Sequence, residues 1–341
     1  MSSQSVKSAV KRVVPRMVWN AMRSAWGMRP VLRPDAKQRS GYSIQLGRDL
    51  FNPGASRIIS TIAELDQEIA RCDAAARESD DSLRRALAEF SYEPGIAMPA
   101  DPDSPEYHAA QMQLYRDVSG RNAYDSSLNE QYAFDLAALV ECPFPYCVKS
   151  AVTVGEQLIA IGFLIRAMNA QPGDRILEFG IGWGKTTIEF AQMGFDVTGV
   201  DVNPGYLELN RLRCERLRLK VQVVQADMLD FQPQGRYDRV LFYECFHHCQ
   251  NPQAMIRRLD ALVAPGGSVV FAGEPIWPTC PFPWTIRLDG MSAYSIRKHG
   301  WFELGFRTDY FLDLLARNGW TTTMTGSLDV PWQSVFIAKR R

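Results

Sequence analysis

Short apolar runs alternate with amphipathic stretches through the second half of the chain. A short apolar run between turn residues is typical of a buried strand, and apolar residues three and four positions apart are typical of a helix. Strands are expected at 174–179, 197–202, 221–229, 237–248 and the end of 261–274. Helices are expected at 151–168, 185–194 and 308–320, and a two-stranded hairpin at 321–339. Strands that alternate with helices predict an α/β fold around a mostly parallel sheet.

The first half of the chain shows a different pattern. Apolar residues alternately four and three positions apart run from Ile58 to Ala76, and the stripe resumes at Leu83 after a polar break at 77–81. This spacing predicts a helical hairpin that packs on itself or on a second subunit. Residues 55–90 are therefore a candidate contact for a homo-oligomer.

A glycine-rich stretch, FGIGWGKTT at 179–187, ends like the phosphate-binding loop of nucleoside-triphosphate enzymes. That loop needs four residues between its first glycine and the Gly-Lys-Ser/Thr ending, but only three separate Gly180 from Gly184. The spacing excludes a triphosphate cradle. The glycines instead lie on a tight turn between an expected strand and an expected helix, where missing side chains let a ligand approach the backbone.

Three acidic residues surround this turn. Asp201 ends the next strand, where a carboxylate is placed to bind a pair of ribose hydroxyls. Glu178, two residues before the first glycine, would repel a pyrophosphate but suits a cationic ligand with an amino group, such as S-adenosylmethionine. Asp227 ends the third strand, in a position to receive an adenine amino group.

Taken together, these features resemble class I S-adenosylmethionine-dependent methyltransferases from about residue 150 to residue 341. The match covers the glycine loop, both acidic positions after it, and the helix, Pro-Gly-Gly turn and fifth strand within 261–274. The resemblance implies a Rossmann-like, seven-stranded, mostly parallel sheet with a C-terminal antiparallel hairpin, and S-adenosyl-L-methionine as the cofactor. The implied cofactor-binding residues are Glu178, Gly180, Gly182, Gly184, Asp201, Ala226, Asp227, Met228 and Tyr243.

The candidate base follows the fourth strand. An alcohol acceptor must lose a proton during methyl transfer, and imidazole titrates near neutrality, so His247 and His248 are candidates. His248 is preferred because it matches the residue most regular in the resembled class, and the other histidine is expected to pack or cap. Glu244 is a further candidate, as base or as cofactor contact. The CFHHC stretch matches no common zinc spacing, so no metal is predicted.

A long connection at 274–307 is expected to cover the site as a lid. It carries aromatic rings beside cationic side chains, which suit a ring bearing hydroxyls and an acidic group, although the rings could also form the lid's own core. The predicted substrate-binding residues are Glu274, Trp277, Trp284, Arg287, Arg297 and Trp301. The segment resembles methyltransferases associated with bacterial surface-polysaccharide assembly. That resemblance implies O-methylation of a sugar or glycan hydroxyl in polysaccharide biosynthesis.

Other functions stay open. The same fold serves small-molecule N- and C-methyltransferases, and a catalytically silent scaffold of this fold is a third alternative. Nucleic acid is not expected as a partner, because the Asn/Asp-Pro-Pro-aromatic signature of amino-directed nucleic-acid methyltransferases is absent and the catalytic half is not basic.

Charge is uneven although the chain has no net charge. Residues 1–48 carry ten Lys or Arg and a single acid, Asp35. Within them, residues 1–30 could form an interfacial helix on an anionic membrane, an arm docked elsewhere, or a transit peptide. The seven cysteines show no disulfide framework, which favours a cytoplasmic protein, with a peripheral position at the inner face of the membrane as an alternative.

The expected organisation has three parts. They are a basic arm at 1–48, a helical and irregular region at 49–150, and a methyltransferase domain at 151–341 with the lid as an insertion. Within the middle part, residues 91–106 are typical of a linker, and 107–150 has no periodicity that predicts an element.

Overall fold

The computed structural model describes residues 55–141 and 151–341. All of them belong to one compact unit. The basic arm at 1–48, including the expected interfacial helix at 1–30, lies outside the described residues, as does the end of the middle region at 142–150. In the described ranges, no helix has the length and apolar composition needed to cross a membrane.

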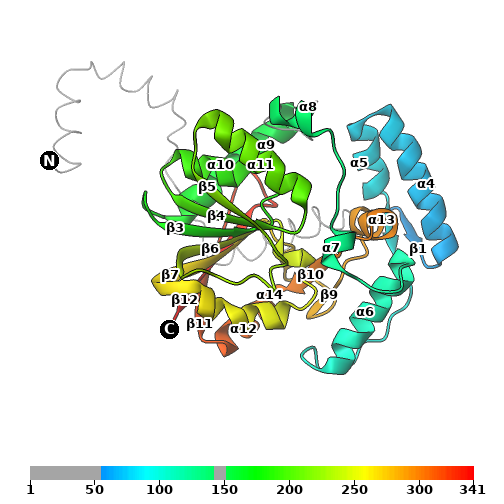
Figure 1. Cartoon of the computed structure of the whole chain (residues 1–341). Helices are drawn as coiled ribbons and strands as arrows, with labels where there is room; N and C mark the ends of the chain where they lie inside the picture. The colour runs from blue at the N-terminus through cyan, green and yellow to red at the C-terminus, as the bar shows by residue number, and fades with distance from the viewer. Residues whose placement is uncertain (1–54, 142–150) are drawn as a thin grey trace, which may run out of the picture. The chain divides into compact units, whose positions relative to one another are not determined.

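A seven-stranded sheet forms the centre of the fold (Figure 1). Its strands are β3 (Arg175–Phe179), β4 (Asp196–Asp201), β5 (Val221–Gln225), β6 (Tyr237–Tyr243), β7 (Val263–Ala272), β11 (Trp320–Gly326) and β12 (Ser334–Arg340). They lie in the order β11-β12-β7-β6-β3-β4-β5. β12 is antiparallel to both of its neighbours and the other pairs are parallel, so the sheet is mixed. The hairpin expected at 321–339 is the β11–β12 pair.

Helices cover both faces of this sheet. They are α9 (Ala151–Met168), α10 (Lys185–Gln192), α11 (Pro204–Leu217), α12 (Pro252–Leu262) and α14 (Thr308–Arg317). Side chains alternate between the faces along each strand. In β6, Leu241 packs in a cluster with Leu164 of α9, whereas Val240 packs in another cluster with Phe311 of α14. Burial on both faces explains why the central strands read as continuous apolar runs.

Two of these helices begin at an Asn-Pro pair. Asn203 accepts a hydrogen bond from the Gly205 N–H at 2.8 Å, and Asn251 accepts one from the Ala254 N–H at 2.9 Å. The proline that follows each asparagine occupies the first turn, where no N–H partner is needed. The first cap starts α11 directly after β4, and the second starts α12 after the short turn at Phe246–His248 that follows β6.

The helical hairpin of the first half is present as α4 (Ile62–Glu78) and α5 (Asp80–Ala88). Thr61 and Glu64 form a capping box at the start of α4. Ser79 ends α4 and also caps α5 through the Ser82 N–H, which explains the polar break in the apolar stripe. Leu65 and Cys72 of the stripe are buried within the chain itself.

The middle of the chain, expected to be a linker at 91–106 and irregular at 107–150, contains further helices and a strand. They are β2 (Phe90–Tyr92), which pairs with β1 (Arg57–Ile59), and α6 (Pro105–Ser119), α7 (Ser126–Asn129) and α8 (Leu136–Glu141). Ser104 caps α6, and Gly120 ends it in the left-handed conformation. Gln111 is fully buried among the apolar residues of α6 and bonds to the lid backbone at Ile286, 2.8 Å away. This polar residue on the buried face weakened the helical pattern in the sequence.

The lid is a small folded layer rather than a loop. Its elements are β8 (Ile276–Trp277), β9 (Trp284–Ile286), α13 (Gly290–His299) and β10 (Leu304–Arg307), with the strands in the order β8-β10-β9. In Figure 1, α13 lies among the helices of the first half, and it packs against α4, α5, α6 and β2. A Cβ on Gly290 would lie 2.1 Å from the Leu87 carbonyl oxygen, so this contact requires glycine. The first half and the lid therefore pack as one layer.

Candidate active site

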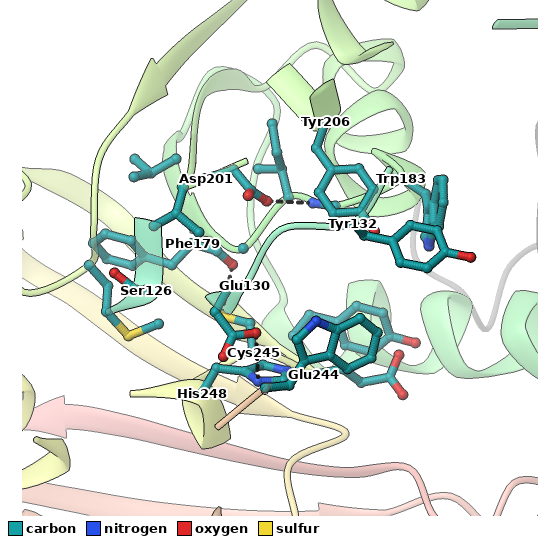
Figure 2. Close-up of a pocket in the computed structure, with 18 of the residues that line it drawn as sticks. Ser126, Glu130, Tyr132, Phe179, Trp183, Asp201, Tyr206, Glu244, Cys245 and His248 are labelled. Carbon is teal, nitrogen blue, oxygen red and sulfur yellow. Dashed lines mark hydrogen bonds and ion pairs between the residues drawn. The ribbon is translucent and has the colours of Figure 1, made fainter. Parts of the chain in front are cut away.

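A cavity of about 540 Å³ opens at the carboxyl ends of β3, β4 and β6, where ligands bind in open α/β sheets (Figure 2). Its walls come from three sources: the glycine loop and strand ends, the segment 124–132 of the first half, and the lid around α13. The described part of the chain therefore builds the cavity from regions far apart in the sequence.

The glycine loop forms one wall. Gly180 and Gly182 line the cavity with φ values of 65° and 44°. A Cβ on Gly180 would lie 2.5 Å from the Cβ of Cys245, so the turn after β3 requires glycine. Gly184 instead caps α10 beneath the loop, where a Cβ would meet the side chain of Asn210, and it is not among the cavity-lining residues.

Two acidic residues near this loop have different positions. Asp201 lines the cavity and accepts hydrogen bonds from the N–H groups of Gly182 and Asn203, both at 2.9 Å. Burial raises the pKa of Asp201 to about 6 although those bonds oppose the shift. This carboxylate holds the loop and faces the site expected to bind ribose.

Glu178 is placed differently from the expectation. Its carboxylate is buried and accepts hydrogen bonds from the hydroxyls of Thr186 and Thr187, the latter at 2.7 Å. It is not among the cavity-lining residues, and burial raises its pKa to about 7. The two threonines after Gly-Lys supply hydroxyls that turn the carboxylate toward the start of α10. In this structure Glu178 therefore supports the loop from behind, and contact with an amino group of the cofactor stays a prediction.

Four further residues of the predicted cofactor site lie together in the structure. Ala226, Asp227, Met228 and Tyr243 all line the cavity. Asp227 accepts a hydrogen bond from the Ser126 hydroxyl at 2.5 Å and one from the Leu229 N–H at 2.7 Å. Ser126 belongs to the first half of the chain, so this region reaches the strand ends directly.

An aromatic wall was missed by the sequence reasoning. Trp183, Tyr132 and Tyr206 line the cavity, with Trp183 and Tyr206 ring centroids 4.9 Å apart and Tyr132 and Trp183 centroids 5.9 Å apart (Figure 2). Trp183 lies inside the glycine loop itself, which is the one signal in the sequence. Tyr132 comes from the stretch with no assigned element, so its position could not be read from pattern.

His248 lines the cavity beside a carboxylate that the sequence did not suggest. Its Nδ1 is buried, has no hydrogen-bond partner, and lies 3.5 Å from Oε2 of Glu130. The other Glu130 oxygen accepts hydrogen bonds from the Tyr124 hydroxyl at 3.0 Å and the Phe302 N–H at 2.7 Å. Burial lowers the pKa of His248 to about 4 and raises the pKa of Glu130 to about 7. The ring is therefore held neutral next to a fixed carboxyl group.

His247 has a different role. Its Nδ1 lies 2.8 Å from Oε2 of Glu274, and it is not among the cavity-lining residues. Glu274 also accepts hydrogen bonds from the N–H groups of Cys245 and Phe246, both at 2.8 Å, and of His247 at 3.1 Å. It thereby fixes the short turn at Phe246–His248 that positions His248. Glu274 was expected at the substrate, but the structure places it inside the protein as the anchor of this turn.

Glu244, at the end of β6, is exposed and lines the cavity. Its φ of 51° is uncommon for a residue other than glycine and indicates local strain. A Cβ on Gly273 would lie 2.8 Å from the Cγ of Glu244, so the glycine leaves room for this side chain. The surrounding protein and the carboxylate of Glu274 raise the pKa of Glu244 to about 7, whereas Lys185 lowers it.

Most of the lid residues predicted to bind substrate do not line this cavity. Only Trp301 lines the cavity, together with lid residues that the sequence did not single out: Met291, Tyr294, Ser295 and His299. Trp284 is buried and donates its indole N–H to the Pro102 carbonyl at 2.9 Å. Trp277 packs under the guanidinium of Arg287, whose carbon lies 5.6 Å from the ring centroid.

The lid cations are paired away from the cavity. Arg287 lies 3.0 Å from Asp289, and Arg297 lies 2.7 Å from Asp66 of α4. Neither is among the cavity-lining residues. The physical reason is the packing of the lid on the first half: its aromatic rings form a shared core, and its cations meet the acids of α4 and of the lid itself.

One group among the described residues has the donor types of a metal site. Ring nitrogens of His247 and His248 and a carboxylate oxygen of Glu303 lie within 4.8 Å of one another. The Glu303 carboxylate lies 3.8 Å from the guanidinium of Arg287, and His247 is held by Glu274.

Comparison with known proteins bears on the segment that carries the glycine loop and the strand ends. Residues 176–267 match a family model described as a methyltransferase domain. This segment, which is less than half of the chain, is similar to a methyltransferase domain. The domain contains Asp201, Asp227 and His248, and it supports S-adenosylmethionine as the cofactor.

Several curated relatives of this segment are ubiquinone biosynthesis O-methyltransferases. The ubiquinone biosynthesis O-methyltransferase of Bordetella avium (strain 197N) is 36% identical over 102 residues, which cover 29% of this chain and 42% of that protein. The protein of that name from Vibrio parahaemolyticus serotype O3:K6 is 30% identical over 116 residues, which cover 33% of this chain and 49% of that protein. The chain thus spans about half the length of the curated relatives it matches, or less.

Solved structures are more distant. The 1,6-didemethyltoxoflavin-N1-methyltransferase of Burkholderia thailandensis, solved with 1,6-didemethyltoxoflavin and S-adenosylhomocysteine, is 18% identical, with 60% of this chain and 88% of that chain covered and a TM-score of 0.41. Similarity at that level is too weak to support a conclusion about this chain.

Proposed function

We propose that this protein is an O-methyltransferase that uses S-adenosylmethionine to methylate a hydroxyl group on a ring-bearing acceptor. The single observation that carries the proposal is the pairing of His248 with Glu130 at the cavity that also holds the glycine loop. A neutral imidazole beside a fixed carboxylate is the arrangement of a general base with an orienting partner. An acceptor hydroxyl needs such a base, whereas an already nucleophilic nitrogen does not.

In the proposed reaction, S-adenosylmethionine supplies the methyl group. The acceptor oxygen forms a bond to the methyl carbon while the bond from that carbon to sulfur breaks, and sulfur keeps the electron pair. The hydroxyl proton passes to His248. The Glu130 carboxylate then stabilises the imidazolium that forms, because opposite charges attract strongly where water is scarce.

The cofactor is proposed to lie along the glycine loop. In this proposal Asp201 binds its ribose and Asp227 its adenine, beside Trp183 and Tyr206, whose rings meet edge to face with their centroids 4.9 Å apart. Lys185 also lines this side and donates a hydrogen bond to Gln157 of α9 at 3.2 Å. A cation at this point suits the carboxylate of the methionine part of the cofactor.

Two acceptor classes fit a hydroxyl-bearing ring. A sugar or glycan hydroxyl is the class implied by the lid's resemblance, and Trp301 offers a ring face on which a sugar could stack. Arg287 and Arg297, which were expected to assist a sugar, are instead paired with Asp289 and Asp66. A phenol is favoured by the aromatic wall and by the relatives named ubiquinone biosynthesis O-methyltransferase. Two further partners are proposed from the sequence alone. They are a membrane surface bound through residues 1–30 and a second copy of the chain bound at residues 55–90.

Replacement of Glu130 tests the proposal directly. Glu130→Gln keeps the shape and removes the charge, so transfer of a labelled methyl group to a phenol and to a sugar should fall while S-adenosylmethionine binding, measured by calorimetry, stays unchanged. His299→Ala is the matched control, because His299 lines the same cavity and stacks on Trp301 without an orienting glutamate. Equal turnover in Glu130→Gln and the wild type would rule out the His248–Glu130 pair as the base.

A further inference from the structure

The charges that line the cavity are unbalanced. Among the cavity-lining residues of the described chain, four carry carboxylates: Glu130, Asp201, Asp227 and Glu244. Lys185 is the one Lys or Arg in that set, and it begins α10 on the glycine-loop side. The half of the cavity that receives the acceptor, between the end of β6 and the lid, holds Glu130 and Glu244, and Lys185 acts on the second of them by lowering its pKa.

The lid cations do not correct this imbalance. Arg287 pairs with Asp289, Arg297 pairs with Asp66, and Lys298 pairs with Asp73. Each of these pairs joins the lid to itself or to α4, away from the cavity. An acceptor with a carboxylate or phosphate would thus meet no guanidinium or ammonium from the lid, and it would face the carboxylates of Glu130 and Glu244.

Glu244 is the carboxylate in this half that is not held by a hydrogen bond in the described part of the chain, although the charge of Lys185 lowers its pKa. Glu130 is held by Tyr124 and Phe302, whereas no hydrogen bond or ion pair to the Glu244 carboxylate occurs among the described residues. Its backbone is nevertheless held at a strained φ of 51°, with Gly273 leaving space for the side chain. Strain of this kind at a cavity persists where surrounding structure imposes it, and it often serves binding.

Aromatic rings also line the cavity. Tyr132 and Trp301 line it with ring centroids 6.2 Å apart, and Tyr294 lines it from α13. A carboxylate together with aromatic faces is the combination that recognises a protonated amine, through a charged hydrogen bond and cation–π attraction.

We propose that the acceptor carries a protonated amine beside the hydroxyl that is methylated, and that Glu244 binds this amine. The proposal rests on the proposed O-methyltransferase function and adds the charge class of its substrate. It applies equally to an amino sugar and to an amine-bearing phenol, which share this chemistry.

Two matched series of acceptors test the charge class. The phenols are dopamine, catechol and 3,4-dihydroxybenzoate, which share one diol ring with a positive, a neutral and a negative substituent. The sugars are glucosamine, glucose and glucuronate. In the series that is methylated, kcat/KM should be highest for the amine and lowest for the acid. The two values should differ at least about tenfold, because one charge pair near a protein surface contributes on that scale. Equal rates, or a preference for the acid, would overturn the proposal.

Substitution of Glu244 identifies the residue. Glu244→Gln should lower kcat/KM for the amine about tenfold more than for the neutral member of the series, because only the amine loses a charged partner. Glu189→Gln is the control, since Glu189 is exposed on α10 and outside the cavity. If Glu244→Gln instead weakens S-adenosylmethionine binding in calorimetry and leaves the amine preference intact, Glu244 belongs to the cofactor and the assignment is wrong.

Failure of methyl transfer is distinguishable from failure of the charge assignment. If no acceptor of either series is methylated, the six compounds are titrated into the protein bound to S-adenosylhomocysteine, with tryptophan fluorescence as the readout because Trp183 and Trp301 line the cavity. Tighter binding of the amines keeps the proposed charge class even when the reaction itself is not O-methylation. Absence of that order contradicts it.

Discussion

The glycine-loop wall and the lid wall of the same cavity differ in how they are specified. On the loop wall, the turn itself is held by residues close in sequence and by neighbouring strands, such as Gly182 with Asp201, and the first half adds Ser126 and Tyr132 to it. On the lid wall, the shape depends on packing between α13 and the helices α4, α5 and α6 of the first half, on the order of two hundred residues earlier in the chain. The comparison teaches that a short motif can define where a cofactor binds, whereas the acceptor site needs the whole fold.

Replacement of His248 should have the largest effect on turnover. It tests the proposed base, which must act between the cofactor at the loop wall and the acceptor at the lid wall. His248→Ala should lower turnover roughly 10²–10⁴-fold, the usual contribution of a general base. Cofactor affinity should hardly change, because the proton transfer concerns the acceptor. The measurement is methyl transfer under saturating S-adenosylmethionine, with calorimetry of cofactor binding alongside.

The pH dependence of kcat/KM also tests His248 as the base. Burial lowers the pKa of His248, so the acidic limb should lie below pH 6.5, where the ring would otherwise protonate. Glu130 raises the pKa of His248, and Glu130→Gln should therefore move the limb further toward acid. A limb that is identical in His248→Ala and the wild type would assign the titration to another group.

Substitution of Gly290 should destabilise the packing of the lid wall on the first half. Gly290→Ala brings a Cβ within 2.1 Å of the Leu87 carbonyl oxygen and 2.8 Å of the Phe90 carbonyl oxygen. Overpacking of this kind should lower the free energy of unfolding by about 1–3 kcal/mol. Gly162→Ala in α9 is the control, because nothing lies within 4 Å of its added Cβ, and there the substitution should be neutral or stabilising in denaturant unfolding.

Loss of Asp201 tests the loop wall. Asp201→Ala removes the partner of the Gly182 N–H and the proposed ribose contact. S-adenosylmethionine binding should weaken by about 1–3 kcal/mol, the scale of a lost hydrogen bond to a charged group. Unchanged affinity in calorimetry would remove Asp201 from the ribose role.

The two lid tryptophans separate a cavity residue from a core residue. Trp301→Ala should raise the KM of the acceptor without an effect on cofactor affinity, because Trp301 lines the acceptor half of the cavity. Trp284→Ala should instead lower the free energy of unfolding by about 3–5 kcal/mol, because Trp284 is fully buried. Steady-state kinetics and denaturant unfolding of both variants make the distinction. A raised acceptor KM for Trp284→Ala, without destabilisation, would reverse the two roles.

The smallest expected effect concerns Glu178 behind the loop. Burial raises its folded pKa to about 7, so the folded state binds the proton more tightly than the unfolded state. Its contribution to stability is therefore fully present below the unfolded pKa and is lost as pH rises through about 7. Glu178→Gln should reduce the fall in the free energy of unfolding between pH 5 and pH 8 by on the order of 1 kcal/mol. An equal pH dependence in variant and wild type would indicate that Glu178 is not the group responsible.

The sequence by itself determined the strand-loop-helix succession and, with it, the cofactor side of the cavity. The turn at Gly180 and Gly182 and the acids at Asp201 and Asp227 were readable because strand period, turn residues and spacing are local properties of the chain. Parallel strands also bring their carboxyl ends to one edge, so the convergence of these residues followed from the pattern.

Only the tertiary structure decided the acceptor side. Glu130, Tyr132 and Ser126 lie in a stretch with no readable period, and they reach the cavity because α6 and α13 pack the first half against the lid. The aromatic and cationic residues of the lid looked equally suited to a ligand or to a core. Which of them face the cavity depends on long-range contacts such as Arg297 with Asp66, and residue type and local spacing carry no information about a partner that distant.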